Sequence, residues 1–137
     1  MTLGTLTLTA FRSYTAQTFE FTAPVVVLTG ENGAGKTNIL EAISLLAPGR
    51  GLRGAKLGEF QKVGCPVPWA VSARLQGGTR LGTGRDPNSE DSARRVVVVE
   101  GQRTTPAALL DHLAVSWITP MMDRLWTESP SARRRFL

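Results

Sequence analysis

Eight residues from Gly30 to Thr37, reading Gly-Glu-Asn-Gly-Ala-Gly-Lys-Thr, constrain this chain more than any other feature. They fit the pattern G-x-x-x-x-G-K-[ST] of a phosphate-binding loop without a gap. A continuous apolar run at residues 25–29 leads into the loop, and apolar residues recur at helical spacing from residue 36 to about residue 47. A buried strand that feeds the loop and a helix that leaves it are the context this motif needs. The sequence therefore predicts an α/β fold with a nucleotide site.

Each residue type in the loop has a physical task in holding phosphate. Gly30, Gly33 and Gly35 let the backbone approach phosphate oxygens and adopt dihedral angles closed to other residues. Backbone N–H groups and the N-terminus of the helix form an anion-binding nest. Lys36 is expected to reach the β- and γ-phosphates, and the Thr37 hydroxyl to be a ligand of Mg²⁺. The candidate residues for ATP are Gly30, Glu31, Asn32, Gly33, Ala34, Gly35, Lys36 and Thr37, with Thr37 also the candidate metal ligand.

A second acidic residue, which phosphate-loop ATPases use to hold Mg²⁺ and place the attacking water, is harder to find. Four valines at residues 96–99 followed by Glu100 have the form of an apolar strand that ends in an acid. However, Glu100-Gly101-Gln102 predicts a turn that reverses the chain at once, and no second acid follows directly. We therefore favour a hairpin strand over a metal-binding strand end, and expect the catalytic carboxylates to lie outside these residues.

Alternation of apolar and polar residues predicts further strands. Leu6, Leu8 and Ala10 alternate with threonines, and a second strand around Phe19 is expected after a hairpin connection at residues 12–15. More strands are expected at residues 69–75, 79–83 and 95–100, a short helix capped by Thr105 at residues 106–113, and a short buried strand at residues 115–119. Basic, glycine-rich residues 49–64 and polar residues 85–91 read as loops.

Composition fits one globular domain or part of one. The chain has 137 residues, 42% of them hydrophobic and 20% charged, and no apolar stretch is long enough to span a membrane. A net charge of +5 favours polyanionic partners such as DNA, although an arginine-rich genome would give the same balance. A single cysteine, Cys65, cannot form an internal disulfide, which fits the cytoplasm.

Five blocks of sequence resemble, in order, the N-terminal part of the RecF family of bacterial recombination and repair ATPases. The blocks are residues 8–14, 30–43, 48–53, 117–120 and 133–137. This family is related to the ATPase heads of SMC and ABC proteins. The resemblance implies lobe I of such a head, a phosphate-loop core with an antiparallel β subdomain, and residues 1–137 are expected to form the N-terminal part of the head.

The resemblance also implies a function in DNA replication, DNA repair and the SOS response to DNA damage. Members of the family bind ATP between two heads, and the ATP-driven homodimer binds duplex DNA near single-strand junctions. They act with RecR and RecO to help load RecA at gaps. Arg12 matches a position that approaches the nucleotide in SMC-like heads, and Asn32 a loop position shared with them. Arg50, Arg53 and Lys56 are further candidates for contact with nucleotide or DNA.

Two departures from the family pattern leave roles unassigned. Many such heads carry a glutamine near residues 115–120, whereas the matching stretch here, which includes Ser116, has none. Many relatives also place an acid sooner after Pro120 than Asp123. Residues 129–137 predict a helix that has only begun, so we expect a piece of a longer protein that binds nucleotide weakly and does not turn it over. A nucleotide-binding interaction module without hydrolysis, another ABC-type ATPase and a phosphate-loop kinase are the alternatives.

Overall fold

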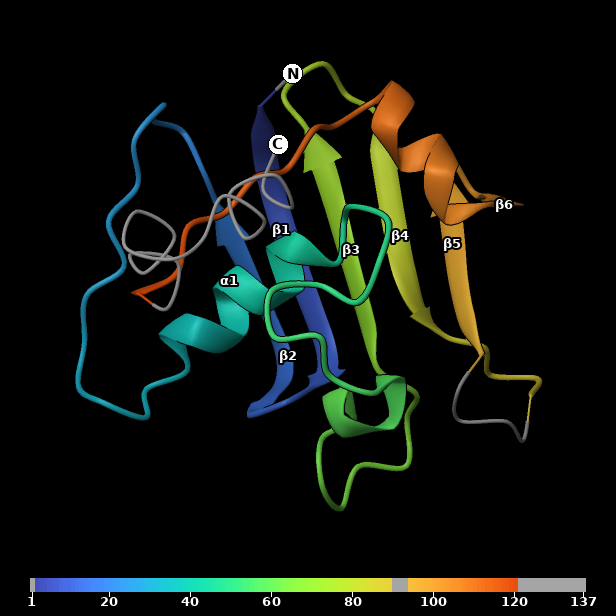
Figure 1. Cartoon of the computed structure of the whole chain (residues 1–137), viewed down its shortest axis with the longest axis horizontal. Coiled ribbons are helices and arrows are strands. Elements are labelled where there is room, and N and C mark those ends of the chain that lie inside the picture. The colour runs from blue at the N-terminus through green and yellow to red at the C-terminus, as the bar shows by residue number, and fades with distance from the viewer. Residues whose placement is uncertain (1, 90–93, 121–137) are drawn as a thin grey trace, which may run out of the picture.

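A six-stranded antiparallel sheet and one α-helix organise the chain, whose computed structural model describes residues 2–89 and 94–120 (Figure 1). The sheet has the order β2-β1-β3-β4-β5-β6. Its strands are β1 (Leu3–Phe11), β2 (Tyr14–Glu20), β3 (Ala70–Leu75), β4 (Arg80–Arg85), β5 (Arg95–Val99) and β6 (Gln102–Thr104). The helix is α1 (Lys36–Ser44), and two short 3₁₀ helices are η1 (Leu57–Phe60) and η2 (Pro106–Asp111).

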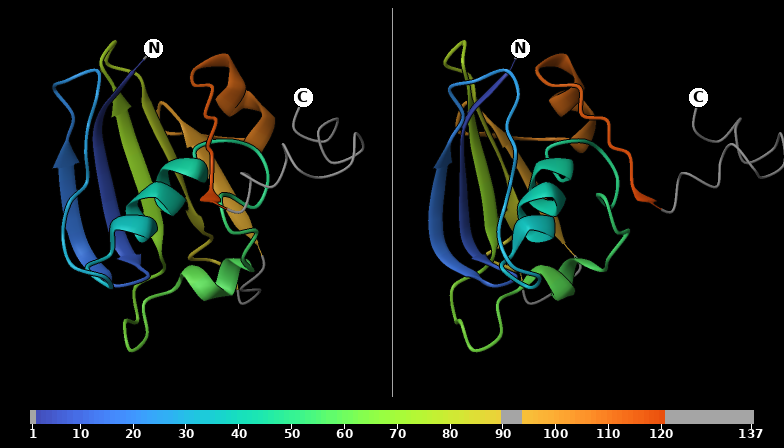
Figure 2. Two further views of the ribbon diagram at one scale, coloured as in Figure 1. Left: turned by 60° about the vertical axis from the view of Figure 1, so that its left-hand side comes forward. Right: turned by 90° about the vertical axis from the view of Figure 1, so that its left-hand side faces the viewer.

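One face of the sheet is apolar and is covered by helices. Leu6 and Leu8 of β1 and Val71 of β3 are fully buried, because every second residue of a strand points to the same face. Figure 2 shows α1 and η2 on the same side of the sheet. The predicted alternation in the first strand and in residues 69–75 is thus confirmed.

An aromatic cluster closes the core at the end of β1. The rings of Phe11 and Phe60 stack with their centroids 5.5 Å apart, and Trp69 meets Phe60 edge-on at 5.2 Å. Backbone hydrogen bonds tie the same region together, because the N–H of Arg12 donates to the carbonyl of Phe60 at 2.7 Å. The chain that follows α1 is therefore fastened beside the β1–β2 turn.

The prediction of buried strands at residues 25–29 and 115–119 is wrong for this structure. Neither segment forms a strand, and Val25, Val27 and Ile118 are 77%, 77% and 79% exposed. A strand buried on both faces needs neighbours that share its hydrogen-bond ladder. The antiparallel sheet of the described residues offers these segments no such neighbour.

The reading of Glu100 as part of a hairpin is confirmed. β5 pairs with β6 antiparallel, and Glu100 lies in the connecting turn with a φ of 50°. The short strand β6 was not predicted. Thr105 is the N-cap residue of η2, as predicted, but its side chain makes no capping hydrogen bond. The predicted helix at residues 129–137 and Asp123 lie outside the described residues.

Candidate functional site

The loop of residues 30–37 folds around the amine of its own lysine. Gly30, Gly33 and Gly35 have φ angles of 148°, 87° and 96°, values that strongly favour glycine. Lys36 Nζ donates hydrogen bonds to the carbonyl oxygens of Gly30 at 2.5 Å and of Glu31 at 2.7 Å. The lysine thereby closes the loop, and its ammonium group stays exposed to solvent.

Strand β2 supports the loop from the side. The Tyr14 hydroxyl donates a hydrogen bond to the carbonyl of Gly35 at 3.2 Å, and burial raises the pKa of this phenol. A Cβ atom at Gly35 would lie 2.6 Å from the Tyr14 oxygen. The glycine at this position is therefore required by packing as well as by its backbone conformation.

A polar hollow of about 250 Å³ lies at the mouth of the loop. It is lined by Asn32, Gly33, Gly35, Lys36, Thr37, Asn38 and Arg53. The lining offers an ammonium, a guanidinium, amides and a hydroxyl, which together suit an anion. Complete small-molecule sites occupy about 300–1,000 Å³, so this hollow has the size for a phosphate chain rather than for a whole nucleotide.

The Thr37 hydroxyl fits its predicted part in a Mg²⁺ site. It is exposed, it lines the hollow, and it has no hydrogen-bond partner among residues 2–89 and 94–120. A hydroxyl oxygen is a hard ligand of the kind Mg²⁺ prefers. Within the same residues no three acidic, histidine or cysteine side chains come together as a metal-binding group.

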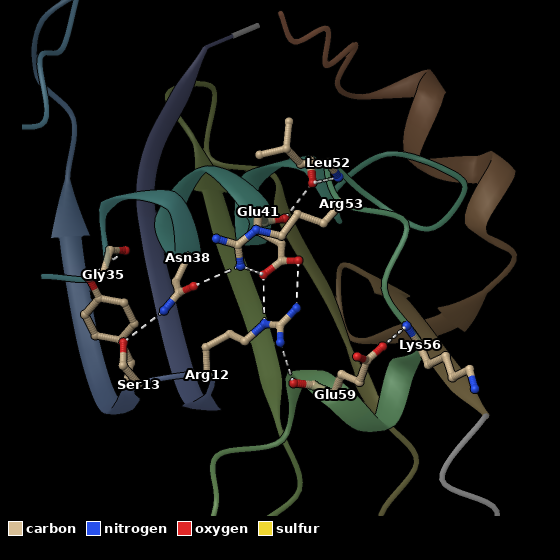
Figure 3. Close-up of polar contacts among 11 residues, drawn as sticks. Arg12, Ser13, Gly35, Asn38, Glu41, Leu52, Arg53, Lys56 and Glu59 are labelled. Carbon is tan, nitrogen blue, oxygen red and sulfur yellow. Dashed lines mark hydrogen bonds and ion pairs between the residues drawn. The ribbon is translucent and has the colours of Figure 1, made fainter. Parts of the chain in front are cut away.

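Beside the loop, Arg12 binds a buried carboxylate that the sequence reading missed. Arg12 Nε and Nη2 donate to the two oxygens of Glu41 at 2.8 and 2.9 Å, and Arg12 Nη1 donates to the carbonyl of Glu59 at 2.9 Å (Figure 3). The guanidinium also lies 5.2 Å from the ring centre of Phe60. Arg12 is thus brought close to α1 without lining the hollow, and its contact with nucleotide stays a prediction.

Of the three predicted candidates Arg50, Arg53 and Lys56, only Arg53 lines the hollow of the loop. Arg53 Nη1 donates to the side-chain oxygens of Asn38 at 3.3 Å and Glu41 at 3.2 Å. Arg50 and Lys56 instead line a separate hollow of about 640 Å³, together with Arg95. The signal that could have revealed Glu41 was an acid four residues after Thr37, on the same face of the helix.

Comparison with known proteins agrees with this geometry. Residues 5–63 match the family described as "AAA domain". The chain is 45% identical over 140 residues to the DNA replication and repair protein RecF of Rhizobium leguminosarum bv. trifolii, covering all of this chain and 37% of that protein. It is 48% identical over 145 residues to RecF of Caulobacter vibrioides, covering 98% of this chain and 36% of that protein.

Two solved structures share the fold. One, of the recombination mediator protein RecF-ATPrS in the RecFOR pathway, superposes with a TM-score of 0.82 at 28% identity, covering 98% of this chain and 36% of that chain. Another, of RecF-ATP in the same pathway, gives a TM-score of 0.79 at 28% identity, with the same coverage. The described sheet and helix therefore occur in a protein solved with ATP.

The fold and the phosphate-loop motif match those of the RecF ATPase head, the class of fold expected from the sequence. More particularly, the chain is homologous to the N-terminal portion of the RecF proteins. It spans a little over a third of the length of these relatives.

Proposed function

We propose that this chain is the ATP-binding part of a DNA replication and repair protein of the RecF type. ATP and Mg²⁺ bind at residues 30–37, with Lys36 on the terminal phosphates and Thr37 on the metal. In the longer protein, ATP joins two heads into a homodimer that binds duplex DNA near single-strand junctions. The protein works in the cytoplasm with RecR and RecO and helps to load RecA at gaps.

The observation that carries this proposal is the phosphate loop itself. One hollow of phosphate size is lined by Gly33 and Gly35, whose φ angles are positive, by Lys36, whose amine is bonded within the loop, and by Thr37, whose hydroxyl has no partner among the described residues. A generic anion site does not need this arrangement, whereas a nucleotide triphosphate with its metal uses every part of it. The likeness to a RecF solved with ATP supports the same ligand.

The test is DNA binding by the longer protein with and without Mg-ATP. We expect binding to a duplex with a single-strand junction to require ATP and to be lost in Lys36→Ala. Binding that ignores ATP, falls only with added salt and survives Lys36→Ala would reduce the interaction to non-specific attraction between a basic protein and DNA. That outcome would contradict the proposal.

A second candidate is a nucleotide-binding module that does not hydrolyse ATP. The observation that favours it is the hairpin at Glu100, which removes the one acid of the described residues that resembles a catalytic strand end. Release of phosphate from ATP by the longer protein, absent in Lys36→Ala, would exclude this candidate. ATP binding without any release of phosphate would support it.

A further inference from the structure

The carboxylate of Glu41 joins two arginines at the edge of the phosphate loop (Figure 3). The side chain of Glu41 is 0% exposed, and its Oε2 accepts hydrogen bonds from both Arg12 Nε at 2.8 Å and Arg53 Nη1 at 3.2 Å. A buried carboxylate is strongly unfavourable unless it is paired and hydrogen-bonded. The two guanidinium groups supply that pairing and leave one net positive charge in the cluster.

The two arginines differ in how much of their bonding capacity is used. Arg12 is committed to Glu41, to the carbonyl of Glu59 and to the ring of Phe60. Its backbone has a φ of 51°, a conformation that costs a non-glycine residue roughly 1–2 kcal/mol. Each of the three guanidinium nitrogens of Arg12 thus makes a bond, and these bonds fix Arg12 in place as an anchor for the Glu41 carboxylate.

Arg53, in contrast, has donors to spare. Its side chain is 42% exposed and lines the hollow of the phosphate loop. Nη1 is bonded to Asn38 and Glu41, while Nε and Nη2 have no hydrogen-bond partner in the part of the chain that the structure describes. Asn38 is itself held by a bond of 3.1 Å from its amide nitrogen to the Ser13 hydroxyl.

We propose that Glu41 is a positioning residue of the phosphate site. Its carboxylate, anchored by Arg12, holds the guanidinium of Arg53 at the hollow so that the free donors face the terminal phosphate of bound ATP. This inference rests on the proposed function, because it requires that the loop binds ATP. Glu41 should therefore increase the preference of the site for ATP over ADP, since only ATP carries that phosphate.

The test is the affinity of Glu41→Gln for Mg-ATP and Mg-ADP, measured by calorimetry on this chain. Glutamine keeps the size of the side chain but loses the negative charge and one of the two acceptor oxygens that hold the guanidinium groups. One hydrogen bond to a charged group corresponds to roughly tenfold or more in affinity. We expect ATP binding to weaken by about tenfold and ADP binding to change less than about twofold.

Two other outcomes would overturn the inference. If Glu41 only lowers the positive charge of the site, Glu41→Gln will bind both nucleotides more tightly. If Glu41 only stabilises the fold, the variant will melt at a lower temperature with an unchanged ratio of the two affinities. Glu59→Gln is the matched control, because it makes the same change of charge while the Glu59 side chain, among the described residues, bonds only the backbone N–H of Lys56.

A double variant tests whether Glu41 acts through Arg53. Arg53→Ala alone should lower the preference for ATP, and Glu41→Gln added to it should lower that preference no further. Additive losses would contradict the inference. If the unaltered chain binds ATP no better than ADP, the inference fails while the proposed function stands; if it binds neither nucleotide, both fail.

Discussion

The missing side chain of Gly35 is what lets β2 support the phosphate loop. A Cβ atom there would lie 2.6 Å from the Tyr14 hydroxyl oxygen and 3.2 Å from the Ser13 hydroxyl oxygen. Gly33 has a similar backbone conformation, with a φ of 87°, but its Cβ would meet no atom within 4 Å. The two glycines therefore separate the cost of conformation from the cost of packing.

Gly35→Ala should lower the free energy of unfolding by about 2–4 kcal/mol, the sum of backbone strain and overpacking. Gly33→Ala should cost only the strain, about 1–2 kcal/mol. Urea denaturation of the two variants gives the comparison. Equal losses would show that Tyr14 does not press on the loop.

Asp86 makes the stability of the fold depend on pH. Its pKa is lowered, first by the hydrogen bond from the backbone N–H of Asn88 and then by Arg103, against the opposing effect of burial. A depressed pKa stabilises the fold above the unfolded value of about 4, and this contribution is lost as the pH falls through the folded pKa. The advantage of the unaltered chain over Asp86→Asn in urea denaturation should be present at pH 7 and vanish near pH 2; a constant difference would contradict this assignment.

The sequence predicted the helices and strands that have a clear local pattern and a place in, or packed on, the antiparallel sheet. The alternation around Leu6 and Leu8 and the helical spacing after Lys36 were sufficient to place β1 and α1. The apolar run at residues 25–29 carries an equally clear pattern, yet it forms no strand. Its hydrophobicity indicates burial, but the neighbour that would bury it is not encoded in the run itself.

The site, like the sheet, was predicted from the sequence only where its pattern is local. The phosphate loop is a local motif, so its residues could be identified by spacing alone. The spacing places Glu41 on the same helix face as Thr37, but the roles of Glu41 and Tyr14 depend on the turn at residues 12–13 meeting α1 in space. That meeting is a tertiary contact between segments about 30 residues apart in sequence.

Arg95 of β5 connects the sheet to the end of α1. Its guanidinium donates to the carbonyls of Leu45, Ala47 and Gly49 and to the Thr83 hydroxyl. Carbonyl groups at a helix C-terminus lack partners within the helix, and a cation there is favourable. Burial lowers the pKa of Arg95, but an arginine stays charged at neutral pH.

Arg95→Leu should lower the free energy of unfolding by about 2–3 kcal/mol, because buried carbonyls lose a charged donor. Arg94→Leu is the control, since Arg94 is exposed and makes one ion pair at 4.0 Å with Asp86, so about 0–1 kcal/mol is expected. Hydrogen exchange at the amides of α1 should speed up in Arg95→Leu alone. Unchanged exchange would contradict the capping role.

The apolar residues that precede the phosphate loop, Val25 to Val27, are left exposed on the surface of the molecule. Val25 and Val27 are each 77% exposed, and Val26 lines an apolar hollow with Leu40. Among residues 2–89 and 94–120, no helix is long and apolar enough to cross a membrane. Contiguous exposed apolar residues promote association of proteins in water.

The chain should therefore self-associate, and Val25→Thr combined with Val27→Thr should reduce that association. Val63→Thr is the control, because Val63 is 96% exposed and does not belong to the run. Sedimentation velocity over a range of concentrations makes the comparison. A monomer at all concentrations would show that the run is not an adhesive surface.

Titration of Mg-ATP into the chain tests whether residues 30–37 bind nucleotide through Lys36. Lys36→Ala is compared with Lys62→Ala, whose lysine bonds the carbonyl of Ser13 at 2.7 Å and does not line the hollow. Circular dichroism confirms that each variant is folded. We expect binding by the unaltered chain and by Lys62→Ala, and none by Lys36→Ala. Equal binding by all three would contradict this expectation.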